Sequence, residues 1–160
     1  MIMPDANILI YAVNHDSDWH QSAKTWWEDT LSGQQVVGIP WVVALAFLRI
    51  TTNRKIFATP LTSTEAIDQL DSWLTQPAAR LISPGDQHWS ILRNLLKQTG
   101  MAGNLTTDAH IAALAIEQGY TVYSADNDFK RFPGLSHINP LSWHDSYQVH
   151  EAKAAYANRI

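Results

Sequence analysis

The chain has 160 residues, of which 46% are apolar and 16% charged, which is typical of one globular domain with a substantial core. It contains no cysteine, which excludes disulfides, thiolate metal sites and cysteine nucleophiles and is compatible with a reducing cytoplasm. The net charge of −4 argues against a broad basic surface, and we expect neither a signal peptide nor a membrane span of ~20 apolar residues.

Apolar periodicity predicts short strands that alternate with amphipathic helices along most of the chain. The first strand is expected within the apolar run from Ile2 to Ala12, which Asp5 and Asn7 interrupt, and the other strands are expected at 36–39, 80–83, 120–123 and 138–140. The helices are expected at 6–12 (helix or turn), 18–31, 41–51, 60–76, 86–99 and 105–118, with a helical turn at 129–132. This alternation predicts an α/β fold, a three-layer α/β/α sandwich around a central parallel sheet.

Local signals mark several ends of these elements. Thr62 and Glu65 have the spacing of a capping box, and Gly119 is expected to end the helix at 105–118 in a left-handed conformation. The start of that helix is expected to be capped by Asn104 or Thr106. Pro4 cannot donate to a sheet, so in a central strand it must face away from a partner or lie at the end.

Three aspartates are expected at one edge of this sheet. Asp5 and Asp126 follow strands and Asp108 lies in the first turn of a helix, and parallel sheets carry their sites beyond the carboxyl ends of the strands. Each has an ordinary role too: Asp5 can cap a turn, Asp108 can oppose a helix dipole, and Asp126 with Asp128 can form an Asx-turn. Converging carboxylates would raise at least one pKa by a unit or more. A hard cation such as Mg²⁺ or Mn²⁺ would relieve this conflict.

Several motifs, in order, resemble a known family. They are DANILIY at 5–11, WVVALAFLR at 41–49 followed by TTNRKIF, GNLTTDAHIAAL at 103–114, SADNDF at 124–129 and FPGL at 132–135. Over residues 1–141 the chain resembles a PIN domain, and more closely the VapC-type ribonuclease toxins of bacterial type II toxin–antitoxin pairs. The resemblance implies a PIN-like sandwich and a cytoplasmic Mg²⁺- or Mn²⁺-dependent endoribonuclease. It also implies a homodimer and a cognate VapB-type antitoxin as inhibitor.

The resemblance also assigns residues. It implies that Asp5, Asp108 and Asp126 are the catalytic metal ligands and that Asp128 is an accessory acid. Ser124 is expected to orient Asp126 through a hydrogen bond of its hydroxyl group. Residues 142–160, which lie outside the resemblance, are expected to form a polar tail with a weak helical pattern.

One position departs from the family pattern. Ala46 stands where PIN domains usually carry a glutamate, which leaves open whether the site holds one metal or two. It also motivates an alternative, a catalytically weakened PIN-like protein that binds RNA or its antitoxin without cutting. A metal-dependent phosphatase is a further alternative, although Asn7 stands where such an enzyme needs a second acid. In a nuclease Asn7 is expected to orient a water at the metal.

The stretch from Gln34 to Thr64 contains no acidic residue but includes Arg49, Arg54 and Lys55. It is either a mildly basic helix end or a contact for RNA phosphate. Arg49 is expected to contact phosphate or pair with a site aspartate, the alternative being a structural salt bridge. The seven tryptophans are expected in core or dimer packing, and His110 is expected to point away from Asp108.

Overall fold

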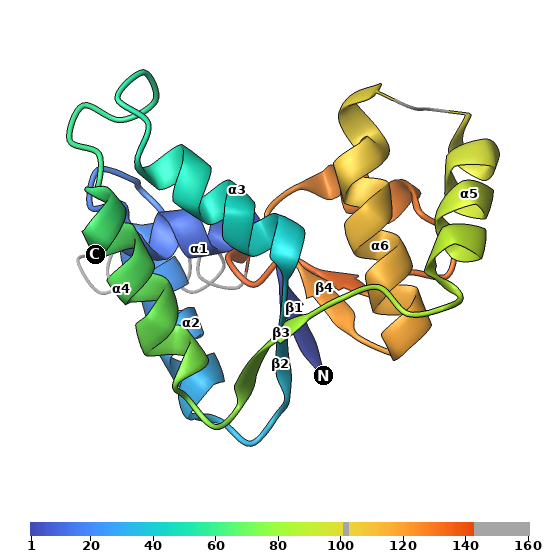
Figure 1. Cartoon of the computed structure of the whole chain (residues 1–160), viewed down its shortest axis with the longest axis horizontal. Coiled ribbons are helices and arrows are strands. Elements are labelled where there is room, and N and C mark those ends of the chain that lie inside the picture. Colours follow the sequence, from blue (N-terminus) through green and yellow to red (C-terminus); the bar gives the residue numbers. More distant parts are fainter. Residues whose placement is uncertain (101–102, 143–160) are drawn as a thin grey trace, which may run out of the picture.

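The computed structural model, which describes residues 1–100 and 103–142, is a five-stranded parallel sheet flanked by helices (Figure 1). The strands, in the spatial order β3-β2-β1-β4-β5, are β1 (Ile2–Pro4), β2 (Val37–Pro40), β3 (Ala79–Ile82), β4 (Thr121–Tyr123) and β5 (His137–Ile138). The helices are α1 (Ala6–Val13), α2 (His20–Ser32), α3 (Trp41–Thr51), α4 (Ser63–Leu74), α5 (His88–Thr99) and α6 (Thr106–Gln118). Two 3₁₀ turns, η1 (Gly103–Leu105) and η2 (Asn127–Arg131), flank α6 and β4. The predicted α/β sandwich is confirmed.

The predicted signals hold at the start of α4 and at the end of α6 but not at the start of α6. The Thr62 hydroxyl accepts from the Glu65 amide at 3.2 Å and Glu65 Oε2 accepts from the Thr62 amide at 2.7 Å, the predicted capping box. Gly119 ends α6 at φ 74°. The predicted cap at the start of α6 is wrong, because η1 runs directly into the helix. Leu105 is the N-cap residue, without a side-chain hydrogen bond, and Thr106 already lies inside.

Pro4 lies in the most central strand, between β2 and β4. It is the last residue of β1 and pairs with Tyr123, so its missing N–H falls at the end of the ladder, as expected. The next residue resumes the pairing, since the Asp5 amide donates to the Tyr123 carbonyl at 2.9 Å. The backbone at the end of β1 is therefore tied directly to the end of β4.

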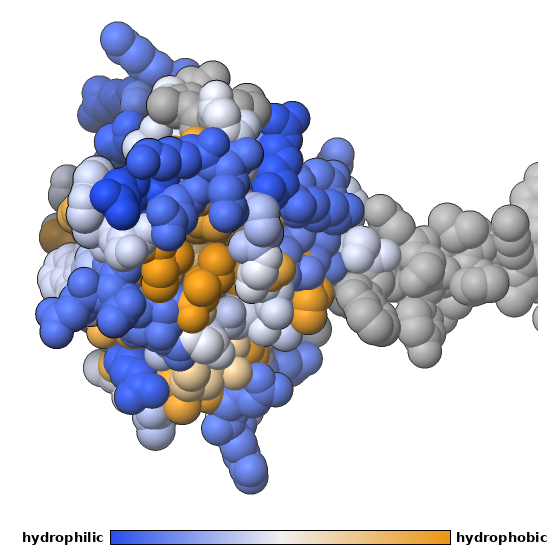
Figure 2. Space-filling model, turned by 90° about the vertical axis from the view of Figure 1, so that its right-hand side faces the viewer, coloured by the Kyte–Doolittle hydropathy of each residue, from blue (hydrophilic) through white to orange (hydrophobic). Residues whose placement is uncertain are grey.

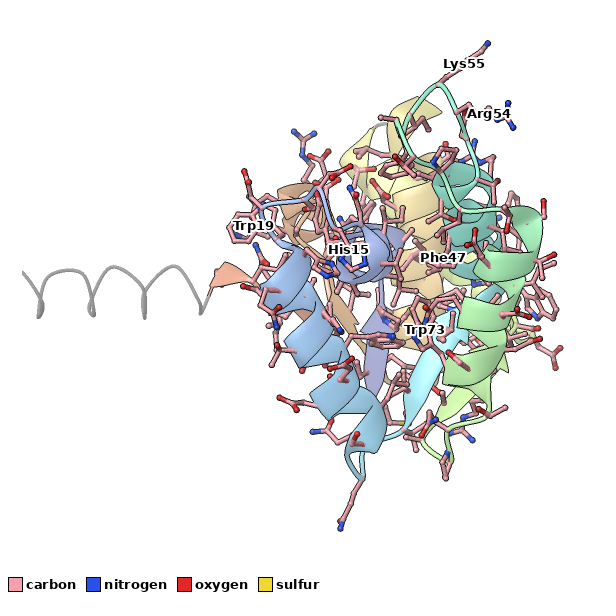
Figure 3. All side chains as sticks on the ribbon, turned by 90° about the vertical axis from the view of Figure 1, so that its left-hand side faces the viewer. His15, Trp19, Phe47, Arg54, Lys55 and Trp73 are labelled. Atoms are coloured by element: carbon pink, nitrogen blue, oxygen red, sulfur yellow. The ribbon has the colours of Figure 1, made fainter. Side chains whose placement is uncertain are left out.

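The core lies between the sheet and its helices. Met3, Ile39 and Val122 of the central strands are completely buried. On the side of α2, α3 and α4, Trp73 packs edge-on against Trp27 at 5.5 Å between ring centroids and lies 5.0 Å from Phe47 (Figure 3). These tryptophans are core residues, as expected.

Two other tryptophans lie outside the core. Trp41 at the start of α3 is 52% exposed and Trp89 on α5 is 67% exposed, while Leu45, one turn after Trp41, is 57% exposed. The face formed by α5 is largely hydrophilic with an apolar patch near its centre (Figure 2). Within the described residues, no helix combines the length and apolar character that crossing a membrane requires.

Candidate metal centre

Four aspartates gather beyond the carboxyl ends of β1 and β4. Asp5 follows β1, while Asp126 and Asp128 follow β4, its neighbour in the sheet, and Asp108 lies in the first turn of α6. Asp108, Asp126 and Asp128 each offer a carboxylate oxygen, and these oxygens all lie within 4.8 Å of one another. Strand order and helix placement thus bring together side chains more than a hundred residues apart.

Asp5 forms the buried side of this group. Its Oδ1 accepts from the Ala6 amide at 2.7 Å, which caps α1, and its Oδ2 accepts from the Ser124 hydroxyl at 2.7 Å. Burial raises the pKa of Asp5, and the nearby charge of Asp126 adds to this; the hydrogen bonds from Ser124 and Ala6 oppose it without reversing it. Asp5 is thus a carboxyl group whose charge the protein compensates only in part.

Ser124 is completely buried at the end of β4. Its hydroxyl accepts from Asn7 Nδ2 at 3.0 Å and from the Asp126 amide at 3.0 Å, and it donates to Asp5. The expected hydrogen bond between this hydroxyl and Asp126 is present, but at the backbone amide of Asp126, while the hydroxyl proton supports the Asp5 carboxylate. Asn7 Oδ1 also accepts from the Ala125 amide at 3.4 Å, so the amide of Asn7 joins α1 to the end of β4.

Asp108 lies within reach of the charges of all three other aspartates. Burial and then the negative charges of Asp5, Asp126 and Asp128 raise the pKa of Asp108 to about 6. The negative charges of the neighbouring carboxylates thus add to the effect of burial on Asp108. A group of this kind is suited to a divalent cation, since oxygen ligands at close range hold hard ions and a cation removes the repulsion.

Asp126 and Asp128 form the exposed side. Asp126 Oδ1 accepts from the Asp128 amide at 2.8 Å, which is the predicted Asx-turn, and caps η2. Asp128 Oδ1 lies 3.1 Å from Nε of Arg131, one turn further along. Arg131 was not among the residues predicted from the sequence, although its spacing of three residues from Asp128 was an available signal.

His137 on β5 was missed as well. Its Nε2 lies 3.0 Å from the Ser124 carbonyl, and its charge lowers the pKa of Asp5. No sequence signal marked this residue, because its place depends on the pairing of β5 with β4. His137 therefore belongs to the surroundings of the carboxylates only in three dimensions.

Three other residues considered from the sequence, all within the described part of the chain, form no side-chain hydrogen bond or ion pair with the four aspartates. Arg49 is exposed and forms no ion pair with the residues that the structure describes, so neither the salt bridge nor the pairing with a site aspartate is present. Ala46 is partly buried on the same helix, which has no acidic residue. His110 points away from Asp108, as expected, with its Nδ1 at 2.9 Å from His88 Nε2.

A separate cavity of about 370 Å³ lies between the loop after α1 and the loop after α3. His15, Asp16, Phe57, Leu61 and Glu65 are among the residues that line it, and none of the four site aspartates does. The carboxylate group thus lies at the sheet edge and the cavity lies elsewhere on the molecule.

Comparison with known proteins identifies the family. The PIN domain family profile matches residues 2–135. Ribonuclease VapC33 of Mycobacterium tuberculosis H37Rv is 40% identical over 141 residues, which cover 88% of this chain and 99% of the relative. Ribonuclease VapC37 of the same strain is 42% identical over 140 residues, covering 88% and 97%.

Solved structures share the fold. A chain of VapBC2 from Rickettsia felis, crystallised with a DNA fragment from its promoter, matches with a TM-score of 0.64 at 24% identity and covers 87% of this chain and 98% of its own. Mycobacterium tuberculosis VapC20, a sarcin–ricin loop cleaving toxin, matches with a TM-score of 0.64 at 19% identity, covering 88% and 100%. The phosphatase alternative is therefore set aside. The chain belongs to the PIN-domain family, within its group of VapC ribonucleases.

Proposed function

We propose that this chain is a metal-dependent endoribonuclease in which Asp5, Asp108 and Asp126 hold Mg²⁺ or Mn²⁺, with Asp128 as an accessory acid. The observation that carries the proposal is the gathering of these carboxylates, with the pKa of Asp108 raised to about 6. RNA as substrate is supported by the relatives named ribonucleases at about 40% identity over nearly their full length.

The donor set suits a hard divalent ion. When bound, such an ion supplies Lewis acidity to a phosphodiester and to the water that hydrolyses it. The chain's own residues prepare the site: Ser124 holds the Asp5 carboxylate through a 2.7 Å hydrogen bond, and Asn7 fixes Ser124 from the side of α1. The exposed Arg49 guanidinium is free to contact a phosphate of the substrate.

The proposed biological role is that of a toxin in a type II toxin–antitoxin pair, acting in the cytoplasm and inhibited by a VapB-type antitoxin. Supporting this role, structures with the same fold include VapBC2 of Rickettsia felis and FitAcB of Neisseria gonorrhoeae. We also propose a homodimer, in which a second copy covers the exposed Trp41 and Leu45 of α3.

The nuclease domain is proposed to be residues 1–141, with residues 142–160 as a tail. The PIN profile covers residues 2–135 of this range. The predicted weak helical pattern of the tail falls on 143–160, outside the described residues.

A PIN-like protein that binds RNA or antitoxin without cutting is the second candidate, motivated by Ala46 in place of glutamate. Metal binding separates the two. A nuclease site should raise the melting temperature in millimolar Mn²⁺, whereas a site that has lost its metal should show no shift.

The decisive experiment is incubation of total RNA with purified, antitoxin-free protein in Mg²⁺ or Mn²⁺, with EDTA and Asp5→Asn as controls. Cleavage that requires both the metal and Asp5 is the expected result. Intact RNA after treatment with folded protein, metal present, would favour the binding protein instead.

A further inference from the structure

The direction of α3 links the carboxylate edge to a distant loop. The helix begins immediately after Pro40, the end of β2, and β2 is the neighbour of β1, which leads into Asp5. The strands in Figure 1 run upward from the N-terminus, so their carboxyl ends, the start of α6 and the loop after α3 lie on the same side. A substrate strand that leaves the carboxylates along α3 would therefore reach this loop.

The loop after α3 presents two cations to solvent. Arg54 and Lys55 are exposed at its tip, where Figure 3 shows both side chains projecting away from the body of the protein. Neither forms an ion pair with a residue in 1–100 or 103–142, and the same holds for Arg49 at the end of α3. Ion pairing within the described residues therefore does not explain the presence of these three cations.

The loop is held in one conformation by its own hydrogen bonds. Asn53 Oδ1 accepts from the Lys55 amide at 2.9 Å, and the Asn53 carbonyl accepts from the amides of Ile56 and Phe57 at 3.0 and 3.1 Å. At the base, the Leu61 amide donates to the Thr51 carbonyl at 2.9 Å. A loop whose shape is fixed before binding loses little conformational entropy when it meets a ligand.

Two acids line the cavity beside this loop, Glu65 and Asp16, and neither forms an ion pair with Arg54 or Lys55. Glu65 is engaged in the capping box of α4, where it accepts from both the amide and the hydroxyl of Thr62. Asp16 lies in the opposing loop and lines the cavity behind, again without an ion pair to a described residue. The positive charge of the tip is therefore left to interact with something outside the chain.

We propose that Arg54 and Lys55, continued by Arg49, bind the phosphates of single-stranded RNA on one side of the bond that is cut. This inference rests on the proposed function. A chain of net charge −4 with a cluster of carboxylates repels a polyanion overall, so affinity must come from local cations. Arginine and lysine contacts to phosphate supply affinity and position the strand without reading its sequence.

The test compares Arg54→Ala/Lys55→Ala with Arg93→Ala/Lys97→Ala. The control removes one arginine and one lysine, both exposed, from α5, which Figure 1 places on the other side of the molecule. Binding of a fluorescein-labelled single-stranded RNA is measured at several salt concentrations in full-length chains that also carry Asp108→Asn, so that the RNA stays intact. Cleavage is measured separately in chains with Asp108 present.

The loop variant should lower the slope of log Kd against log salt by about 1.4, since each phosphate contact on a single strand contributes about 0.7. For two chains that bind equally at 1 M salt, this difference in slope makes the Kd of the loop variant about 25-fold higher than that of the chain with Arg54 and Lys55 at 0.1 M. The control should leave the slope unchanged. In cleavage, the loop variant should raise KM and leave kcat unaltered, because the cations act on binding.

The other outcomes overturn the proposal in distinguishable ways. If wild-type chain binds and cuts RNA, and the loop variant has the same slope and KM as the control, the proposal fails while the proposed function stands. In that case the exposed cations of the loop would be assigned to binding an acidic protein partner. If the wild-type chain neither binds nor cuts RNA, both fail together.

Discussion

The Ser124 hydroxyl and Asp5 Oδ2 form a 2.7 Å hydrogen bond whose direction is fixed by the other partners of the hydroxyl. A serine oxygen has two lone pairs and one proton. Asn7 Nδ2 and the Asp126 amide, both donors, occupy the lone pairs. The proton must therefore point to Asp5, which makes Ser124 an obligatory donor to that carboxylate.

Replacing Ser124 by alanine should weaken both the fold and the site. It leaves the buried Asp5 carboxylate without its donor and two part-buried donors, Asn7 Nδ2 and the Asp126 amide, without an acceptor. A buried unsatisfied group costs about 1–3 kcal/mol. Metal affinity should fall about 10- to 100-fold, as for other residues that orient metal ligands. Urea unfolding and the shift of Tm with Mn²⁺ measure the two effects. Ser90→Ala, on the exposed surface of α5, is the matched control and should change neither.

Asp108→Asn should abolish cleavage yet stabilise the metal-free protein. Asparagine removes the charge whose burial and repulsion raise the pKa of Asp108 to about 6. After a discount for solvent screening, the free energy of unfolding should rise by about 1 kcal/mol. For a domain of this size that corresponds to a Tm about 3 °C higher in EDTA. Asp68→Asn, an exposed acid on α4, should not raise Tm. Retained cleavage by Asp108→Asn would remove it from the set of ligands.

Stability without metal should depend on pH through the same residue. The pKa of Asp108 is higher in the folded chain, about 6, than its ordinary value of 3.8, so the folded state binds more protons between these values. Its contribution is fully present below pH 3.8 and is lost as the pH rises through 6. Burial lowers the pKa of His88 and His110, which acts in the opposite sense.

The comparison of wild-type with Asp108→Asn isolates this effect. The Tm advantage of the variant in EDTA should be largest at pH 7.5 and shrink toward pH 4. In wild-type chain the stabilisation by Mn²⁺ should also decline below pH 6, because protons compete with the ion for the carboxylates. A Tm difference that is constant over this range would contradict the assignment of the raised pKa to Asp108.

Ala46→Glu tests the departure from the family pattern. If this position faces the carboxylates, as the PIN resemblance implies, a fifth acid should lower Tm in EDTA and enlarge the stabilisation by Mn²⁺. Ala46→Gln has nearly the same shape without the charge and should show neither change. Equal behaviour of the two variants would mean that α3 does not present this position to the metal.

The proposed homodimer makes a prediction for α3. Leu45→Glu would place a charge in the interface and should convert the chain to a monomer in light scattering coupled to size exclusion. Ile67→Glu, at an apolar position on α4 that is 48% exposed, serves as the control and should leave the mass unchanged. A wild-type chain that is already monomeric at high concentration would reject the homodimer.

Most of the architecture could be predicted because its signals are local. The bounds of α3 follow from Pro40 and from the continuous apolar run, and the capping box sets the start of α4. The start of α6 could not be predicted, because the 3₁₀ turn η1 replaces a side-chain cap with a continuous backbone path. The last strand is only two residues long and exists through its pairing with β4.

The site also has features that could be predicted from the sequence and features that could not. Strand and helix order placed Asp5, Asp108 and Asp126 at one edge of the sheet, and the family resemblance named them as ligands; their convergence was assumed from that order. The partners of the Ser124 hydroxyl could not be inferred, because the choice among Asp5, Asn7 and Asp126 depends on where β1 and α1 lie against β4. The exposure of Arg49 also required the structure, since periodicity gives its helical face and not what covers that face.

The hydrogen bond from the Asp5 amide to the Tyr123 carbonyl has a consequence for how the site opens. Pro4 has no amide hydrogen to donate, and the Asp5 amide supplies the bond that joins the end of β1 to the end of β4. Beyond it the two segments diverge toward their aspartates. Breaking this bond requires separating the central strands. The Asp5 amide should therefore exchange its hydrogen for deuterium as slowly as the centre of the sheet, with or without metal. A metal ion can then bind and dissociate while the distance between the ends of β1 and β4 stays constant.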